Sequence, residues 1–596
     1  MFKYIGRNSV FLLLSVFTSL TISNAKTDSF PYAEVGLTKR EASAHLLNRF
    51  TFGPKPDQIE QVIALGLEKW FYQQMESQNP SVTLQNKLSH LAITNMTTRD
   101  ILNRHPSSSQ LRALARQEGL VPKEDSRVNS KEVKSQLQKF SRNKGFRTQK
   151  QLVEELKTRK ILQAVYSDQQ LIEVLVDFWF NHFNVSATHR QARVWLPSYE
   201  EEVIRPNVLG DFRTILSATS KHPAMLYYLD NHHSNAKLEN QFVRKRKLTK
   251  EKSIMLSDDK SILIRKKTKR KKNWGINENY ARELLELHTL GIDGNYTQDD
   301  ILTVARALTG WKVNTKYTRT NRSKKPTSDT YFTFVSRNHD IKAKSFLGNY
   351  LPPHRGIEDG EEILDIAAQH PSTARHISEK LAIRFVTEKP TEAYINSLAQ
   401  VFLSSNGDLT QMIIAIAYST EFWAEAKKYK RTKSPFRMVI GTLRAMNAEI
   451  VSTIQLANHI AAMGQDLYAC QPPTGYLDTS DNWINASSVL HRTNFGLDLL
   501  TGQIRGVSIK IGDDLLEQSS GIQIETLCSR LLPTQDVHLM SEEIMLALAK
   551  KPDLNTKKSN RKQKKQHRNR WSGKTDEWQI MQIAGLIIGS PQFQVY

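Results

Sequence analysis

Apolar residues recur at the three- and four-residue spacing of an amphipathic helix along most of the chain. Near the start, Thr38 and Glu41 form a capping-box pattern, which predicts a helix that begins there and ends at Gly53. Two long helices follow at residues 149–166 and 168–183. The same spacing predicts later helices over residues 360–369, 374–386, 391–404, 409–419 and 435–448. Helix is therefore the predicted majority state.

The stretch 277–311, NENYARELLELHTLGIDGNYTQDDILTVARALTGW, has the most readable pattern in the chain. Glu278, Arg282 and Glu286 fall on one stripe of the predicted helix, and Glu283 lies beside them. We refer to these four residues as the Glu/Arg arc. Three carboxylates and one guanidinium in this arrangement form either an ordinary salt-bridged helix face or a catalytic or metal site.

A second polar group is predicted on the helix over 168–183, where His182 falls in line with apolar residues. A histidine there is either a core residue bonded to backbone or part of a polar cluster with Asp177. We predict that the Glu/Arg arc meets this side of the helix, because charged groups in a folded interior need polar partners. The candidate site consists of Glu278, Arg282, Glu283, Glu286, Asp177 and His182, with the adjacent pair His339 and Asp340. The residue pattern indicates no particular metal or cofactor for this candidate site.

One segment, residues 331–337, alternates apolar and polar side chains as a strand does. No strand–helix–strand alternation is found along the sequence, which excludes the α/β classes. The length also exceeds what a single core usually serves. We therefore predict an all-α, multi-helix protein of two closely packed lobes, with at most one short β-hairpin and long basic insertions.

The boundaries follow from where the apolar pattern stops and resumes. We assign residues 1–25 to a signal peptide, 26–231 to an N-terminal helical lobe, 232–276 to a basic disordered insertion, 277–549 to a central and C-terminal helical lobe, 550–574 to a second basic disordered insertion, and 575–596 to a C-terminal helix.

Two tracts carry almost all of the formal net charge of +23. Residues 240–276 hold 14 Lys/Arg against 3 Asp/Glu, and residues 550–574 hold 11 against 1. Such tracts have three interpretations: solvated loops, a binding patch for anionic surface polymers or lipid headgroups, or a nucleic-acid contact. The lack of interleaved aromatic residues argues against the last. We expect solvated loops with weak, salt-sensitive contact to anionic surface polymers.

Residues 1–25 combine a basic opening, an apolar run over 10–22 and small residues before Lys26. This is typical of a secretory signal peptide cleaved after Ala25, and the run is short for a membrane span. We expect an extracytoplasmic protein, periplasmic or secreted, with no transmembrane segment after cleavage. In that compartment Cys470 and Cys528 either pair or remain two buried thiols.

Familiar catalytic motifs are missing from the sequence. It contains no HExxH, GxSxG, GxxxxGK or CxxC pattern, so no nucleotide site is predicted. The loop that starts at Asp293 alternates oxygen-bearing side chains, but Gln298 and Val304 stand where a calcium loop needs Gly and Glu. We interpret this loop as a turn followed by a helix cap.

Several segments resemble, in the same order, the bacterial exported family known as domain of unknown function 1800. They include LTKREASAHLLNRFTFGPKPDQIEQVIALGLEKWFYQQM, LIEVLVDFWFNHFNVSA, HPAMLYYLDN, the stretch 277–311, GQDLYACQPPTGY and SPQFQVY. The resemblance implies a large, helical, exported protein without a settled activity. Relatives commonly carry His where this chain has Phe180, and they join the equivalents of Asn231 and Asn277 by a short loop.

The resemblance also implies a partner, because such proteins are often found beside domain of unknown function 1501, an exported family that resembles alkaline-phosphatase-type enzymes. One interpretation is therefore a partner or scaffold for another exported enzyme, with a buried polar Glu/Arg/His cluster. The alternative is an extracytoplasmic hydrolase, metal-assisted or not, that uses the same cluster. A scaffold would leave the Glu/Arg arc closed by its own salt bridges, whereas an enzyme would present it in a concave pocket. The sequence leaves open whether the chain is an enzyme.

Overall fold

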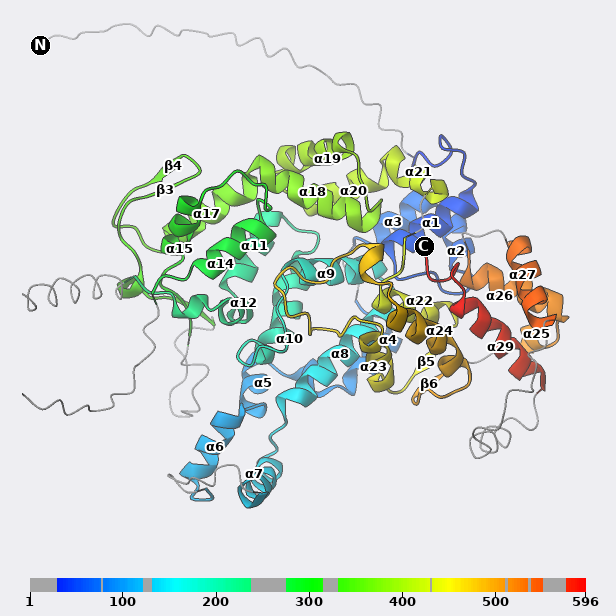
Figure 1. Ribbon diagram of the computed structural model, residues 1–596, viewed down its shortest axis with the longest axis horizontal. Coiled ribbons are helices and arrows are strands. Elements are labelled where there is room, and N and C mark those ends of the chain that lie inside the picture. Colours follow the sequence, from blue (N-terminus) through cyan, green and yellow to red (C-terminus); the bar gives the residue numbers. More distant parts are fainter. Residues whose placement is uncertain are drawn as a thin grey trace, which may run out of the picture.

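The chain is described here from a computed structural model, in which helices form nearly all of the regular structure (Figure 1). The structure describes residues 29–76, 79–121, 131–236, 275–314, 331–428, 431–509, 513–533, 537–549 and 575–596. The predicted signal peptide and the tract 550–574 lie outside these ranges, as does the tract 240–276 except for its last two residues. The predicted all-α class is confirmed.

The first part of the chain forms helices that pack around α8 and α9. Their bounds are α1 (Lys39–Phe50), α2 (Gln58–Leu65), α3 (Leu67–Gln73), α4 (Val82–Ser89), α5 (Thr98–Arg104), α6 (Ser108–Gln117), α7 (Lys131–Asn143), α8 (Gln149–Tyr166), α9 (Gln170–His182), α10 (Leu196–Ser198), α11 (Phe212–Lys221) and α12 (Pro223–Tyr228). The predicted capping box is present at the start of α1, where the Glu41 amide donates to the Thr38 hydroxyl and the Glu41 carboxylate accepts from the Thr38 amide.

The middle of the chain begins with α14 (Glu278–Glu283), which is capped by Asn277 as its side chain predicts and continues as the π-helical turn η6 (Leu284–His288). The next elements are α15 (Gln298–Ala307), β1 (Trp311–Val313), β2 (Phe332–Phe334), β3 (Lys344–Phe346), β4 (Asn349–Leu351), α17 (Glu358–Gln369), α18 (Pro371–Phe385), α19 (Glu392–Ser404) and α20 (Leu409–Ala417). In Figure 1, α18, α19 and α20 form the upper edge of the molecule.

The last part of the chain covers α1 and α8 and forms the right-hand side of Figure 1. Its elements are α21 (Thr420–Lys428), α22 (Pro435–Ala445), β5 (Glu449–Ile450), α23 (Ile454–Ala462), α24 (Ala486–Leu500), β6 (Val507–Ser508), α25 (Asp513–Leu516), α26 (Ser520–Leu531), α27 (Val537–Ala549) and α29 (Thr575–Gly589).

Three two-stranded antiparallel sheets occur in the described ranges, where the sequence predicted at most one hairpin. The predicted strand over 331–337 is present as β2, which pairs with β1 so that Trp311 faces Phe334. Sequence inspection missed β3–β4 and β5–β6 because strands of two or three residues are too short to show an alternating pattern.

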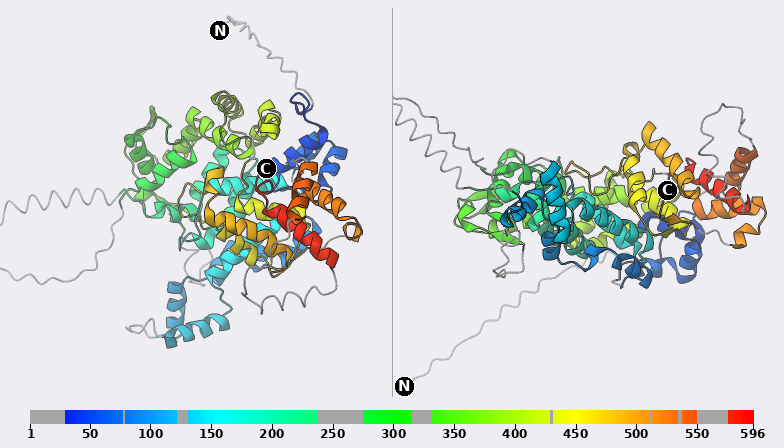
Figure 2. Two further views of the ribbon diagram at one scale, coloured as in Figure 1. Left: turned by 45° about the vertical axis from the view of Figure 1, so that its right-hand side comes forward. Right: turned by 90° about the horizontal axis from the view of Figure 1, so that it is seen from below.

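A single continuous cluster of buried apolar residues extends from Phe30 to Phe593. A second, small cluster lies between α6 and α7, which project from the body in Figure 1 and in the left-hand view of Figure 2. The division into lobes at residue 231 stays a prediction. No helix in the described ranges is long and apolar enough to cross a bilayer.

Buried arginines of α22 bind the carbonyl groups at the end of α1. Arg437 donates to the carbonyls of Asn48 and Thr51, and Arg444 donates to that of Gly53. Both guanidinium groups are almost fully buried. They satisfy carbonyls that have no partner within their own helix, so α1 and α22 depend on each other.

The chain segments on either side of residues 237–274 are bonded to each other. The Asn235 amide donates to the Gly275 carbonyl at 3.2 Å, and the Asn277 amide donates to the Ser234 hydroxyl at 3.2 Å. Residues 232–236, which the predicted insertion included, are therefore part of the packed body, and the chain returns to the place from which it leaves.

Candidate functional site

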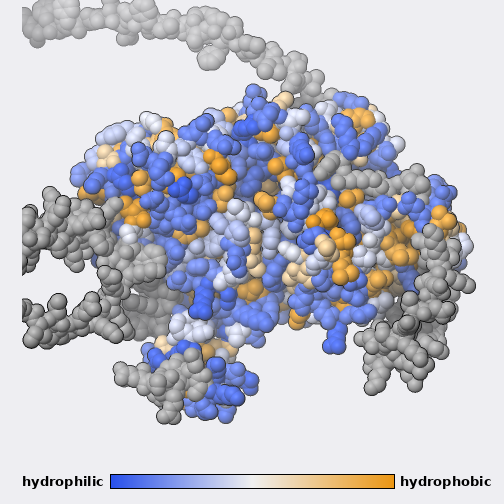
Figure 3. Space-filling view, in the orientation of Figure 1, coloured by the Kyte–Doolittle hydropathy of each residue, from blue (hydrophilic) through white to orange (hydrophobic). Residues whose placement is uncertain are grey.

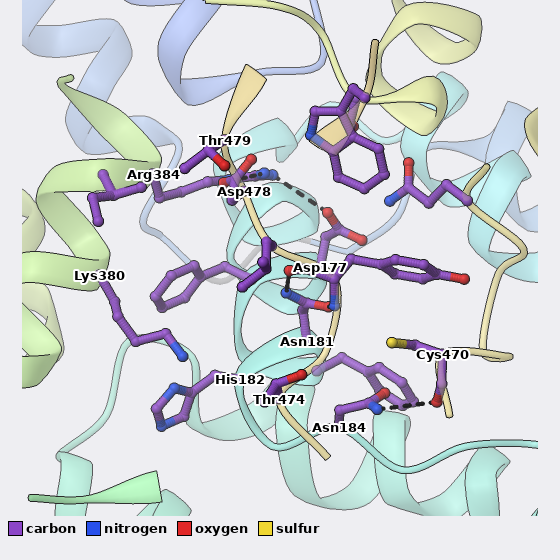
Figure 4. A pocket seen from close by; sticks show the side chains of 18 of the residues that line it. Asp177, Asn181, His182, Asn184, Lys380, Arg384, Cys470, Thr474, Asp478 and Thr479 are labelled. Atoms are coloured by element: carbon purple, nitrogen blue, oxygen red, sulfur yellow. Dashed lines mark hydrogen bonds and ion pairs between the residues drawn. The ribbon is translucent and has the colours of Figure 1, made fainter. Parts of the chain in front are cut away.

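A cavity of about 380 Å³ lies between α9, α18 and the segment 465–483. Its polar lining includes Asp177, Asn181, His182, Lys380, Arg384 and Asp478 (Figure 4). Phe178, Ile383, Leu477 and Trp483 supply apolar surface. A concave, partly apolar space with a few convergent polar groups is the usual form of a small-molecule site.

One end of the cavity is closed by paired charges. Arg384 lies 3.3 Å from Asp177 and 3.1 Å from Asp478, and Lys160 lies 2.9 Å from Asp177. Burial opposes the ionisation of Asp478, but Arg384 and Arg431 outweigh it and lower the pKa of this carboxyl. Both carboxylates already have cationic partners.

The other end of the cavity is formed by histidines. The His182 ring donates from Nε2 to the His288 carbonyl at 3.2 Å, and its centroid lies 6.2 Å from that of His376. Burial, with the nearby charge of Lys380, holds the pKa of His182 well below its usual value. The same two causes lower the pKa of His376 to about 4 and that of His288 to about 3. All three rings are therefore neutral at physiological pH.

Lys380 is the cation at this end, and Figure 4 shows its ammonium group pointing toward His182. In the described part of the chain it has no ion pair and no hydrogen bond. Burial lowers the pKa of Lys380 to about 8. His376, Lys380 and Arg384 recur every four residues, so α18 presents all three on one face. This spacing is the signal that the sequence analysis missed.

The third wall of the cavity is held to α9 by an asparagine. The Asn181 side chain donates to the Tyr476 carbonyl at 2.7 Å and accepts from the Tyr476 amide at 2.8 Å. Gly475 makes this approach possible: a Cβ on this residue would lie 2.3 Å from the Asn181 carbonyl, and its φ is +70°.

The Glu/Arg arc lies beside this cavity but does not line it. Arg282 pairs with Glu286 at 3.1 Å and donates to Gln298, which in turn donates to Glu278. Burial and the neighbouring Glu286 raise the pKa of Glu283, and Arg282 opposes this. The arc is therefore largely closed by its own contacts. It is connected to the cavity through η6, whose last residue, His288, binds His182.

His339 and Asp340 belong to a different buried cluster, under β3 and β4. Asp359 accepts from His339 Nε2 at 3.1 Å and from the Lys344 ammonium at 2.6 Å. Asp340 pairs with Arg306 at 3.1 Å. None of these residues lines the cavity, so the structure brings Asp177 and His182 together there and separates His339 and Asp340 from them.

The lining of the cavity favours binding over nucleophilic chemistry. Cys470 is an unpaired, buried thiol, as is Cys528. Burial raises the pKa of Cys470 to about 11, so it is protonated at neutral pH and a poor nucleophile. Asp177 and Asp478 already contact Lys or Arg, and no group of three metal donors is found among the lining residues that the structure describes.

Comparison with known proteins supports the resemblance drawn from the sequence. No match is found among curated proteins or among solved structures. Residues 45–595 match the family described as "Protein of unknown function (DUF1800)". The match contains α9, α18 and the segment 465–483, and so all three walls of the cavity. Because it extends over nearly the whole sequence, the chain belongs to this family.

Proposed function

We propose that this chain binds a small organic anion in the cavity between α9 and α18. The observation that carries the proposal is Lys380, a partly buried ammonium group at the cavity wall without an ion pair in the described ranges. Charged groups away from bulk water are stable only when they are paired or bonded. An anionic ligand would supply the partner that the described residues do not.

The rest of the cavity defines the kind of ligand. Phe178, Ile383, Leu477 and Trp483 offer contacts to an apolar or aromatic body. Asn181 and Asn184 are committed to backbone carbonyls, so the main charged contact falls to Lys380. A carboxylate or phosphate attached to a ring or short aliphatic chain fits both features and the volume of the cavity.

The test is direct binding with probes that differ only in charge. Benzoate and phenyl phosphate, titrated calorimetrically into the full chain, should bind, whereas benzamide should bind at least tenfold more weakly. Lys380→Gln should remove the preference for the anions. Binding of benzoate should also weaken as the pH rises past about 8, where Lys380 loses its proton.

The matched control is Lys389→Gln, an exposed lysine shortly after α18, which should leave all affinities unchanged. Equal binding of benzoate and benzamide would overturn the proposal. So would benzoate binding that Lys380→Gln does not affect. Circular dichroism of Lys380→Gln separates lost binding from lost folding.

The hydrolase alternative makes a different prediction for the same cavity. His182 Nδ1 is buried without a hydrogen-bond partner among the described residues, so this nitrogen is a base that the cavity offers. A hydrolase built on it would turn over 4-nitrophenyl esters or phosphates, and His182→Gln would abolish that turnover. Turnover that persists in the His182→Gln variant would exclude a hydrolase site built on His182.

A second function, as a partner for another exported enzyme, is favoured by apolar side chains on the surface of the last third of the chain. Leu490, Leu497 and Leu586 are 60%, 44% and 42% exposed. Figure 3 shows apolar patches over the right-hand part of the molecule, where α22 to α29 lie. We propose an exported alkaline-phosphatase-like protein of the 1501 family as the occupant. Leu490→Glu with Leu497→Glu should abolish co-purification with it.

Export itself is supported by the pattern of residues 1–25. Cell fractionation should place the mature chain in the periplasm or the medium, and its N-terminal residue should be Lys26. A cytoplasmic chain that retains residues 1–25 would contradict export.

A further inference from the structure

A group of potential metal ligands lies at the turn that follows α12, outside the lining of the cavity. Asp230, His232 and His233 each offer one donor atom, and these atoms lie within 4.8 Å of one another. All three side chains are half-buried. The two imidazole rings lie side by side, with their centroids 3.8 Å apart.

The hydrogen bond of His232 fixes which of its nitrogens is available. His232 Nδ1 lies 3.1 Å from the Leu226 carbonyl, and a carbonyl can only accept, so Nδ1 carries the proton. Nε2 therefore has a free lone pair, and it is buried without a partner among the described residues. A ring that donates one N–H to a carbonyl and presents the other nitrogen is the usual form of a metal-binding histidine.

The charges around the turn also favour a cation. Asp230 makes no ion pair with a lysine or arginine in the described part of the chain. Two imidazoles and one carboxylate that has no lysine or arginine partner among the described residues therefore favour a bound cation.

The backbone holds the three residues in place. Asp230 has a φ of +60°, which directs the chain back on itself. The Lys312 ammonium donates to the carbonyls of His232 and Ser234, at 2.8 Å and 2.5 Å. These bonds tie the lysine to the backbone of the turn.

We propose that Asp230, His232 and His233 bind one divalent transition-metal ion, with Zn²⁺ as the preferred occupant. Two imidazoles and a carboxylate suit Zn²⁺ and its neighbours in the first transition row, whereas Mg²⁺ and Ca²⁺ prefer an all-oxygen shell. Around one Zn²⁺ such donor atoms lie roughly 3 to 3.5 Å apart. A modest rotation of the three side chains would bring the donor atoms to this separation. Three protein ligands leave a coordination position for water or another ligand.

The experiment uses the full chain purified without a histidine tag and dialysed against a chelator. Equilibrium dialysis with elemental analysis should show one Zn²⁺ or one Co²⁺ per chain and no Mg²⁺ at equal concentration. The Co²⁺ form should have a visible absorption band of the intensity that tetrahedral coordination gives. A weaker absorption band in a variant shows that a ligand to Co²⁺ has been lost, and this readout needs no assay of activity.

Asp230→Asn and His233→Gln should each weaken Zn²⁺ binding at least tenfold. Asparagine tolerates positive φ, so Asp230→Asn keeps the turn and remains informative if a histidine variant fails to fold. His90→Gln is the matched control, because His90 is an exposed histidine at the end of α4. Lys380→Gln should not alter Zn²⁺ binding. Failure of the metal-site proposal can therefore be distinguished from failure of the anion-binding proposal for the cavity. Absence of stoichiometric Zn²⁺, or binding that survives both variants, would overturn the proposal.

Discussion

The Nε2 atom of His182 lies 3.2 Å from the carbonyl oxygen of His288. This bond joins α9 to the last residue of η6, and thus joins the cavity to the helix of the Glu/Arg arc. The bond also requires the proton to lie on Nε2, so Nδ1 carries a lone pair and is buried without a hydrogen-bond partner among the described residues. The sequence predicted a meeting of these two segments. Their contact consists of this hydrogen bond together with ring contacts of His288 with His182 and Phe183.

Acid should destabilise the protein through the buried histidines. A base whose pKa is lowered on folding binds fewer protons in the folded than in the unfolded chain, so stability falls as the pH decreases through the interval between the two values. For His376 this interval runs from 6.5 to about 4. Over it the free energy of unfolding should fall by about 1.4 kcal/mol per pH unit for each such histidine. Urea unfolding of the full chain at several pH values measures this slope, and His376→Gln should reduce it.

Gly475→Ala should displace the wall formed by the segment 465–483. A methyl group there would meet the Asn181 carbonyl at 2.3 Å, and the backbone has positive φ. The control is Gly502→Ala, where φ is +67° but nothing lies within 4 Å of the added atom. Both variants should lose about 1 to 3 kcal/mol of stability from backbone strain. Only Gly475→Ala should weaken benzoate binding, as titration calorimetry would show, and equal benzoate affinities would argue that this wall is not needed.

Asp359→Asn should be severely destabilising. The side chains of Asp359 and Lys344 are both 1% exposed, and they form an ion pair at 2.6 Å. Asp359→Asn removes the nearest carboxylate partner of Lys344 and leaves Asp340, 3.7 Å away, so we expect a cost of about 3 to 5 kcal/mol. Thermal unfolding of Asp359→Asn beside the exposed control Lys342→Met tests this. A melting temperature close to that of the wild type would show that Asp340 alone is a sufficient partner for Lys344.

Arg282→Ala should change little. Arg282 and Glu286 are 40% and 26% exposed, and pairs this accessible contribute about 0 to 1 kcal/mol. A small loss in chemical denaturation with unchanged benzoate binding would agree with a solvated helix face. Loss of benzoate binding in a folded Arg282→Ala protein would instead make the arc part of the binding machinery, as the catalytic interpretation requires.

Deleting residues 240–272 should leave the rest of the fold intact. The segments that flank this part of the chain are already bonded, through Asn235 with Gly275 and Ser234 with Asn277. The tract 240–276 also holds 14 of the basic residues, so its removal should weaken binding to heparin and reduce the salt dependence of that binding. Affinity chromatography at increasing salt, beside the melting temperature, measures both. Cooperative loss of folding would contradict this prediction.

The sequence predicted what depends on local pattern. The ends of α8 and the capping box at Thr38 were both predicted from neighbouring residues, because these contacts reach only a few positions along the chain. The cavity could not be predicted in this way. Asp177 meets Arg384 across 207 positions, and such a pairing leaves no local trace. The spacing of His376, Lys380 and Arg384 could have marked the site, but a helix with basic residues every four positions is also an ordinary solvated surface.

The hydrogen bonds from Arg437 and Arg444 to the end of α1 have a consequence for the order in which the chain folds. The carbonyls of Asn48, Thr51 and Gly53 find these partners nearly 400 positions later. During synthesis, the first helices must therefore wait until α22 has emerged before they can complete their native contacts. Such distant contacts slow folding and leave apolar surface exposed in the meantime. A truncated chain that stops before α22 should accordingly be degraded or aggregate.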